Sequence, residues 1–83
     1  MFFNKNPLEE RIRLASSPLN ELVTKPEVVE ELARDDDDYV RFCLASNPRL
    51  GRISPKAHRM LENDPNPEVR AELRRTDVEN YEP

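Results

Sequence analysis

Apolar residues in this 83-residue chain recur every three or four positions, as they do along one face of an α-helix. Val40, Cys43 and Leu44 illustrate the pattern, because their spacing places the three side chains on the same side of a helix. A half-buried strand is expected to alternate between apolar and polar residues, and no stretch of the sequence does so. The sequence therefore predicts an all-α protein.

Prolines and capping residues predict where the helices begin and end. A proline is tolerated at the first helical position, whereas the residue before a proline is pushed out of the α region. One aspartate of Asp35–Asp38 and the hydroxyl of Ser54 are expected to cap helices. Leu19–Val23 is expected to form a single 3₁₀ or α turn, and Arg49–Ile53 a short connection that contains the only glycine, Gly51. Full helices are predicted at about 7–16, 26–34, 39–46, 55–63 and 67–76.

The chain also contains an internal repeat. Residues 26–44 align with residues 55–73, so that Pro26 falls on Pro55, and six positions in a window of 19 are identical. A period of this size is typical of solenoid proteins, in which each unit packs on its neighbours. The first helix matches only part of the unit, so we predict about two and a half repeats. They would form one domain, residues 1–76, followed by a flexible acidic tail, residues 77–83.

The repeat resembles the leucine-rich repeat variant family. Leu44-Ala-Ser-Asn-Pro48, the helix start Ser54-Pro55 and the later Val69-Arg70 carry the resemblance, which covers about residues 10–75. It implies a right-handed superhelix of HEAT-like repeats, each pairing an α-helix with a shorter, often 3₁₀, helix. It also implies a binding scaffold. The unit is several residues longer than is usual in that family.

Polar residues in the last unit indicate a closed end. Glu72, Arg74 and Arg75 stand where the preceding copy has Cys43, Ala45 and Ser46. A terminal repeat of a solenoid needs such a polar outer face, because no further repeat covers it. We therefore expect a miniature solenoid closed at both ends.

Charge is distributed unevenly along the chain. The net charge is −4 in total, but residues 1–38 carry −5, residues 39–76 carry +4 and the last seven carry −3. Such asymmetry indicates a charged partner or end-to-end self-association, although a small helical protein can also acquire it by chance.

Candidate chemistry is sparse. Asp35–Asp38 lacks the glycine and glutamate that a calcium loop needs at its sixth and twelfth positions, so it is interpreted as a capping turn. His58 is the only histidine, and Cys43 is expected to be a buried, inert thiol. A single glycine cannot form a glycine-rich phosphate loop. We therefore expect no enzyme activity, no metal and no cofactor.

The start of the chain bears on location and assembly. No apolar run is long enough to span a bilayer, and Met1–Phe3 is followed at once by polar residues, unlike a signal peptide. A cytoplasmic protein that does not bind membranes is expected. Phe2 and Phe3 would either cover the first repeat or make a homodimer contact. We favour the cover, and hence a monomer.

Arginines are the candidate binding residues. Arg41 and Arg70 recur in register, each preceded by an aspartate, Asp35 or Asp64. One interpretation is an Asp–Arg pair that fixes the register of neighbouring units. Another is a basic strip on the concave surface, and both can hold because a guanidinium has five N–H donors. The candidates are Arg11, Arg41, Arg70, Arg74 and Arg75.

Three classes of function remain open. The favoured class is a non-catalytic module that binds another protein through its helical or concave face. The second is a HEAT-like nucleic-acid-binding module that uses Arg41, Arg49, Arg52, Arg59, Arg70, Arg74 and Arg75, with Tyr39 and Phe42 to stack on bases. The third is an acidic decoy of a nucleic acid, presenting Glu27, Glu30, Glu31 and Asp35–Asp38.

Overall fold

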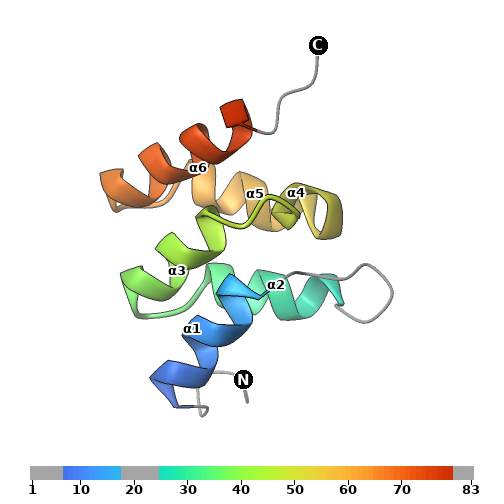
Figure 1. The fold of residues 1–83 in the computed structure, drawn as a ribbon, viewed down its shortest axis with the longest axis vertical. Helices are drawn as coiled ribbons and strands as arrows, with labels where there is room; N and C mark the ends of the chain where they lie inside the picture. Colours follow the sequence, from blue (N-terminus) through green and yellow to red (C-terminus); the bar gives the residue numbers. More distant parts are fainter. Residues whose placement is uncertain (1–6, 18–24, 80–83) are drawn as a thin grey trace.

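The computed structural model describes residues 7–17 and 25–79, which form six α-helices (Figure 1). The helices are α1 (Leu8–Ser16), α2 (Pro26–Ala33), α3 (Asp38–Ala45), α4 (Leu50–Ile53), α5 (Pro55–Glu62) and α6 (Pro67–Glu79). No strand occurs in these two ranges, so the all-α prediction is confirmed there. The expected turn at Leu19–Val23 and the expected cover by Phe2 and Phe3 lie outside the described residues.

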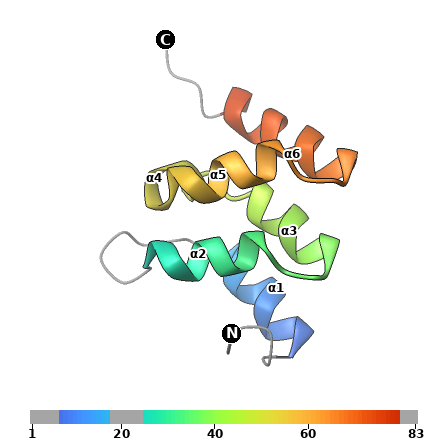
Figure 2. The same cartoon turned by 180° about the vertical axis from the view of Figure 1, so that it is seen from behind.

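The helices form two layers. Helices α1, α3 and α6 follow one another along the longest axis in one layer, and α2 and α5 lie behind them (Figures 1 and 2). The one-turn helix α4 lies beside α5. The molecule measures 40 × 30 × 19 Å, and its shortest dimension agrees with two layers of helices of about 10 Å each. Helix α3 is central, because it packs against both α1 and α6.

Local sequence signals set most helix starts. Pro26 and Pro55 occupy first positions of helices, as predicted. The Asp37 carboxylate accepts a hydrogen bond from the backbone N–H of Tyr39 at 2.8 Å, and Ser54 Oγ accepts one from that of Ala57 at 3.0 Å. These side chains satisfy N–H groups that have no partner within a helix.

Two boundaries differ from the prediction. Helix α1 begins at Leu8, one residue later than predicted, and Pro7 occupies the capping position. Helix α6 continues to Glu79, so residues 77–79 are helical and do not belong to a flexible tail. No proline or glycine directly follows Thr76 to end the helix. Thr76 is also buried, and its hydroxyl donates to the Glu72 carbonyl at 2.9 Å.

The sequence repeat is also a repeat of structure. Helices α2 and α5 begin at Pro26 and Pro55, and α3 and α6 begin at Asp38 and Pro67. The turn between the helices carries the same bond in each copy. Asp35 Oδ1 accepts the N–H of Asp37 at 2.9 Å, and Asp64 Oδ1 accepts the N–H of Asn66 at 2.9 Å. The period seen in the sequence therefore relates two units of the same conformation.

The core lies between the two layers. Leu44 of α3 and Leu61 of α5 have no exposed side-chain surface, as expected from their aligned apolar positions. Val29, rather than Val28, is the fully buried valine of α2. Cys43 is only half-buried, so the prediction of a buried thiol was wrong. It lies toward the outer side of α3, where it borders a groove described below.

Candidate functional site

The recurring arginine joins two turns in the middle of the molecule. Arg41 Nη1 donates to the carbonyl oxygen of Asp35, in the turn that precedes its own helix, at 2.7 Å. Its Nε donates to Asp64 Oδ2 at 2.8 Å, and its Nη2 donates to Asp64 Oδ1 at 3.4 Å. Arg41 is only 14% exposed and Asp64 only 3%. The guanidinium thus ties two successive units together through a partly buried, two-pronged ion pair.

The same arrangement recurs in part on either side. Arg11 Nη1 lies 3.4 Å from Asp35 Oδ1, so the first helix contacts the turn of the next unit. Arg70 Nη1 donates to the carbonyl oxygen of Asp64 at 2.5 Å, as Arg41 does to Asp35. We call Arg11, Arg41 and Arg70, with the turns they bind, the arginine ladder.

The ladder agrees with the register interpretation of Arg11 and Arg41, and it leaves fewer arginines available for a basic strip. Arg11 and Arg41 are each 14% exposed and already hold a carboxylate, so their charge is neutralised inside the protein. Arg75 is bound by Glu72 and by Glu79, which together raise the pKa of its guanidinium above the usual value. Among the described residues, Arg74 has no side-chain partner, Arg70 has only the carbonyl of Asp64, and the Nε of Arg11 is buried without a hydrogen bond.

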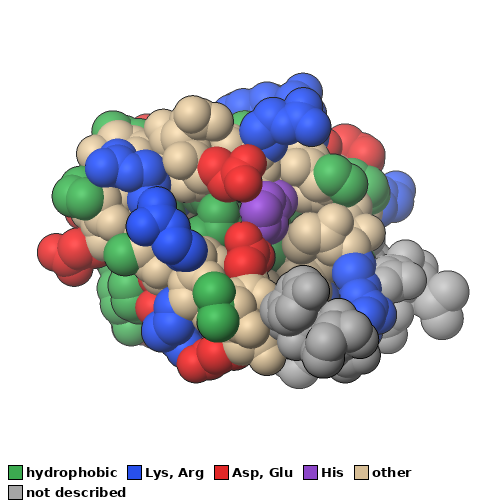
Figure 3. Space-filling view, turned by 90° about the horizontal axis from the view of Figure 1, so that it is seen from above, with side chains coloured by type: hydrophobic (Ala, Val, Ile, Leu, Met, Phe, Trp, Pro, Cys, Tyr) green, Lys and Arg blue, Asp and Glu red, His purple; other side chains and the backbone are tan. Residues whose placement is uncertain are grey.

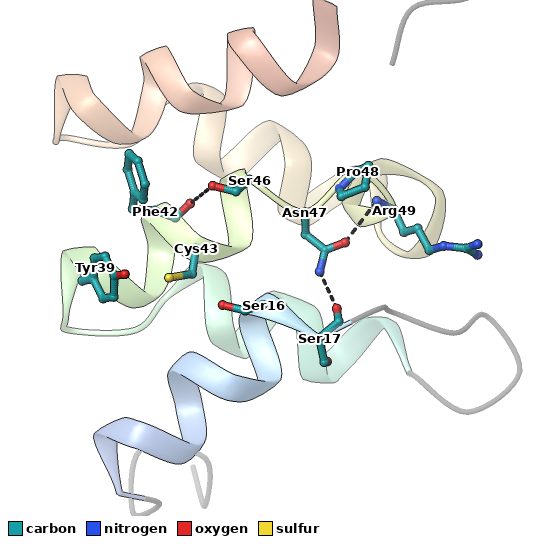
Figure 4. Close-up of a pocket in the computed structure, with 9 residues that line it drawn as sticks. All are labelled: Ser16, Ser17, Tyr39, Phe42, Cys43, Ser46, Asn47, Pro48 and Arg49. Carbon is teal, nitrogen blue, oxygen red and sulfur yellow. Dashed lines mark hydrogen bonds between the residues drawn. The ribbon is translucent and has the colours of Figure 1, made fainter. Parts of the chain in front are cut away.

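A groove lies between α1 and α3 (Figure 4). Its volume is 390 Å³. The residues that line it, which define the α1–α3 groove, are Ser16, Ser17, Tyr39, Phe42, Cys43, Ser46, Asn47, Pro48 and Arg49. Helix α3 supplies its aromatic wall, and the end of α1 supplies the opposite wall.

Aromatic side chains give the groove its chemical character. The rings of Tyr39 and Phe42 stack with centroids 6.2 Å apart and planes inclined by 9°. Tyr39 is 55% exposed, which is unusual for a large ring on a chain with 36% charged residues. Cys43, one turn along α3, raises the pKa of the Tyr39 hydroxyl, first through the charge of its thiolate and then through a hydrogen bond. The groove is therefore an apolar surface with hydroxyl groups at its rim.

Asn47 makes the groove rigid. Its side-chain amide donates to the carbonyl oxygens of Ala15 at 3.0 Å and Ser17 at 2.7 Å. Its own oxygen accepts the N–H of Arg49 at 3.2 Å. A buried amide that satisfies three backbone groups fixes the end of α1 against the loop after α3. Asn47 thus joins the two sides of the groove by hydrogen bonds.

Sequence reasoning did not identify this groove. Tyr39 and Phe42 were noted only as aromatic residues that could stack on bases, and Arg49 only as one of several basic residues. The available signal was an aromatic pair three residues apart on the polar side of a predicted helix. The opposite wall comes from Ser16 and Ser17, at the end of a different helix. That separation along the chain explains why local patterns could not reveal it.

The acidic surface of the decoy hypothesis is largely occupied. Asp35 is 2% exposed and contacts Arg11. The carboxylate of Asp37 caps α3, and that of Asp38 accepts the side-chain amide of Asn66 at 2.8 Å. Glu30 and Glu31 contact Lys56 and Arg34. Only Glu27 and Asp36 of this set are without a partner in the described part of the chain.

Comparison with known proteins identifies no relative, since no family model, curated protein or solved structure matches this chain. Among the described helices, none is long and apolar enough to cross a membrane. Over residues 7–17 and 25–79, no group of three or more histidine, cysteine, aspartate or glutamate side chains could hold a metal ion.

Proposed function

We propose that this protein is a non-catalytic interaction module, a short HEAT-like solenoid that binds a segment of another protein in the α1–α3 groove. The observation that carries the proposal is the exposed Tyr39–Phe42 stack beside a half-buried Cys43, in a groove held open by Asn47. Tyrosine and arginine are among the residues that most often dominate protein interfaces, and Tyr39 and Arg49 both line this groove.

The groove suits an extended segment that carries an apolar or aromatic side chain. Such a side chain would lie against Tyr39 and Phe42 and remove their apolar surface from water. The serine hydroxyl of Ser16 and the exposed guanidinium of Arg49 lie at the rim, where they could bond the polar backbone or an acidic side chain of the segment. A pocket of 390 Å³ is large enough for one or two side chains.

The nucleic-acid alternative has less support. It needs a continuous set of available arginines, but Arg41 is held by Asp64 and Arg75 by Glu72 and Glu79. The Tyr39 and Phe42 rings stack on each other, which leaves one face fewer for a base. The decoy alternative needs available carboxylates, and most of those are bound to other side chains, as described above.

The proposal is tested with variants of exposed groove residues. The tagged protein is used to isolate its partner from the native cell, and the affinity of the purified pair is then measured by calorimetry. Tyr39→Ala and Arg49→Ala should each weaken binding at least tenfold, which corresponds to about 1.4 kcal/mol. Neither should change the melting temperature by more than a few degrees, because both side chains are exposed.

A matched control separates groove effects from general effects of surface substitution. Val78 is 70% exposed on α6 and does not line the groove, so Val78→Ala should bind as the parent does. Equal affinity of Tyr39→Ala and the parent would contradict the proposal. Binding to a single-stranded oligonucleotide that weakens steeply with salt would instead favour the nucleic-acid alternative.

A further inference from the structure

The arginine ladder is incomplete at Arg70. Arg41 uses Nη1 for the turn of its own unit and uses Nε and Nη2 for the carboxylate of the next unit. Arg70 makes the first of these contacts, to the carbonyl of Asp64. Its Nε and Nη2 have no partner within residues 7–17 and 25–79. Two donors that hold a carboxylate in one unit are therefore unoccupied in the other.

These donors border a pocket of 260 Å³, here called the α5–α6 pocket, at the end of the molecule where α6 lies (Figures 1 and 3). It is lined by Glu62, Arg70, Leu73, Arg74 and Asp77. In the first copy, helices α2 and α3 contact the following unit, α5 and α6. The pocket lies on the equivalent surface of the second copy, formed by α5 and α6. A carboxylate bound there would therefore take the place that Asp64 takes at Arg41.

The charged side chains that line the pocket balance one another, because Glu62 and Asp77 are acidic and Arg70 and Arg74 are basic. The two kinds differ in their hydrogen bonds. His58 Nε2 lies 3.0 and 2.9 Å from the two Asp77 oxygens, and its Nδ1 lies 3.9 Å from Glu62 Oε2. Figure 3 shows the histidine between acidic side chains on this end of the protein. The case for a carboxylate ligand therefore rests on the donors of Arg70 and on its equivalence to Arg41, and not on the net charge of the pocket.

Another repeat of the same kind does not fit this end. Where Ala33 and Ala45 are buried by the following unit, the second copy has Glu62 and Arg74. Packing a helix over these two charged side chains would remove them from water at a cost on the order of several kcal/mol each. The end face therefore excludes an apolar helix pair but retains a place for a carboxylate.

A second copy of this chain does not supply the missing carboxylate either. The aspartate bound by an arginine of the ladder lies in the turn of the next unit, as Asp64 does for Arg41 and Asp35 for Arg11. In a second copy stacked on this end, the sequence positions that lie one repeat before Asp35 are Asn6 and Lys5. Neither side chain carries a carboxylate, so stacking two copies end to end would leave Arg70 unpaired.

We propose that Arg70, with Arg74 beside it, binds an aspartate or glutamate side chain of a partner protein in the α5–α6 pocket. The carboxylate completes the ladder by accepting from Nε and Nη2 of Arg70, in the geometry of the Arg41–Asp64 pair. This surface is separate from the α1–α3 groove, so either proposal can fail while the other holds. A partner long enough to reach both would carry an acidic residue near its groove-binding segment.

The test observes the guanidinium directly. The Nε–Hε signals of Arg41 and Arg70 are followed by NMR while a blocked peptide copying residues 61–69, which contains the Asp64 turn, is added. The chemical shift of the Arg70 signal should change with peptide concentration until it saturates. That of the Arg41 signal should not change, because its donors are already occupied. A peptide with asparagine in place of Asp64 should bind at least tenfold more weakly. Arg70→Gln should abolish the response of the remaining backbone signals around the pocket, whereas Arg13→Gln, on the exposed side of α1, should not.

Four outcomes would overturn the proposal. The first is an Arg70 signal that does not respond, and the second is one that responds equally to both peptides. The third is a response to a phosphate-containing oligonucleotide but not to the peptide, which would assign the donors to nucleic acid. The fourth concerns the protein without peptide. The Arg70 Nε–Hε group would be as protected from solvent as that of Arg41 in the wild type, and it would lose this protection in the Glu82→Gln variant. That result would make an acid of the same chain the occupant.

Discussion

The two full copies of the repeat differ in what surrounds them, although their turns are the same. In each copy the arginine donates to the carbonyl of the preceding turn, Arg41 to Asp35 and Arg70 to Asp64. Helix α3 has a neighbour on both sides, α1 and α6, whereas the main neighbours of α6 within residues 7–17 and 25–79 are α3 and α5. The same residue therefore fixes register in one copy and presents available donors in the other.

In the proposal made above, this difference allows an arginine that is structural in one copy to bind a partner in the other. The local sequence gives Arg70 and Arg41 the same two markers, since each directly follows a valine and lies six residues after an aspartate. The neighbouring side chains do distinguish it. Glu62 and Arg74 replace the alanines that a following unit would cover, so this end faces water and Arg70 keeps two donors.

The largest expected contrast concerns the core leucines Leu44 and Leu73, which occupy equivalent positions. Leu44→Ala should lower the free energy of unfolding by about 2–5 kcal/mol, because helices on both sides prevent the cavity from collapsing. Leu73→Ala should fall at the lower end of that range, because Leu73 borders the open α5–α6 pocket. Chemical denaturation of both variants measures the difference. A parent-like midpoint for Leu44→Ala would refute its place at the centre of the core.

Substitutions of Arg41 and Arg70 should also differ in their cost to the free energy of unfolding. The loss should again be larger in the first copy, but the difference should be smaller than for the leucines. Arg41→Ala leaves the 3% exposed carboxylate of Asp64 without its cation, which should cost about 1–3 kcal/mol. Arg70→Ala removes a single hydrogen bond to a carbonyl and should cost about 1 kcal/mol or less. Thermal unfolding of the two variants under identical conditions compares them. Equal losses would mean that the Arg41–Asp64 pair contributes no net stability.

The smallest expected effect is a pH dependence of stability that comes from Glu72, which contacts Ser46 of the loop after α3 and Arg75 of α6. The Arg75 guanidinium and, to a lesser degree, the Ser46 hydroxyl lower the pKa of Glu72 below its usual value. A carboxyl group with a lowered folded-state pKa stabilises the protein above its unfolded pKa of about 4.3, and the stability is lost as the pH falls through the folded value. Glu72→Gln should therefore cost about 1 kcal/mol at pH 7.

Acid should remove most of that difference between Glu72→Gln and the parent. Melting curves at pH 7 and pH 3 provide the measurement, with Glu68→Gln, an exposed acid of the same helix, as the control that should change little at either pH. A Glu72→Gln deficit of the same size at both pH values would show that charge on Glu72 is not its cause.

The sequence by itself determined the parts of this protein that depend on nearby residues. Prolines at first helical positions, the caps at Asp37 and Ser54 and the spacing of Val40 and Leu44 act within one or two turns of helix. Such signals are readable without knowing what lies opposite them. They predicted an all-α chain, most helix starts and the core leucine of α3, and the repeat predicted two units of one conformation.

Only the tertiary structure decided which side chains remain available for a partner. Arg41 and Arg70 are equivalent in sequence, but the carboxylate that occupies Arg41 comes from the turn of the following unit. Cys43 fits an apolar pattern, yet it is only half-buried, because it borders the α1–α3 groove. The physical reason is the same in both cases. Occupancy and exposure are set by groups far away in the chain, and the local periodicity of a helix carries no information about them.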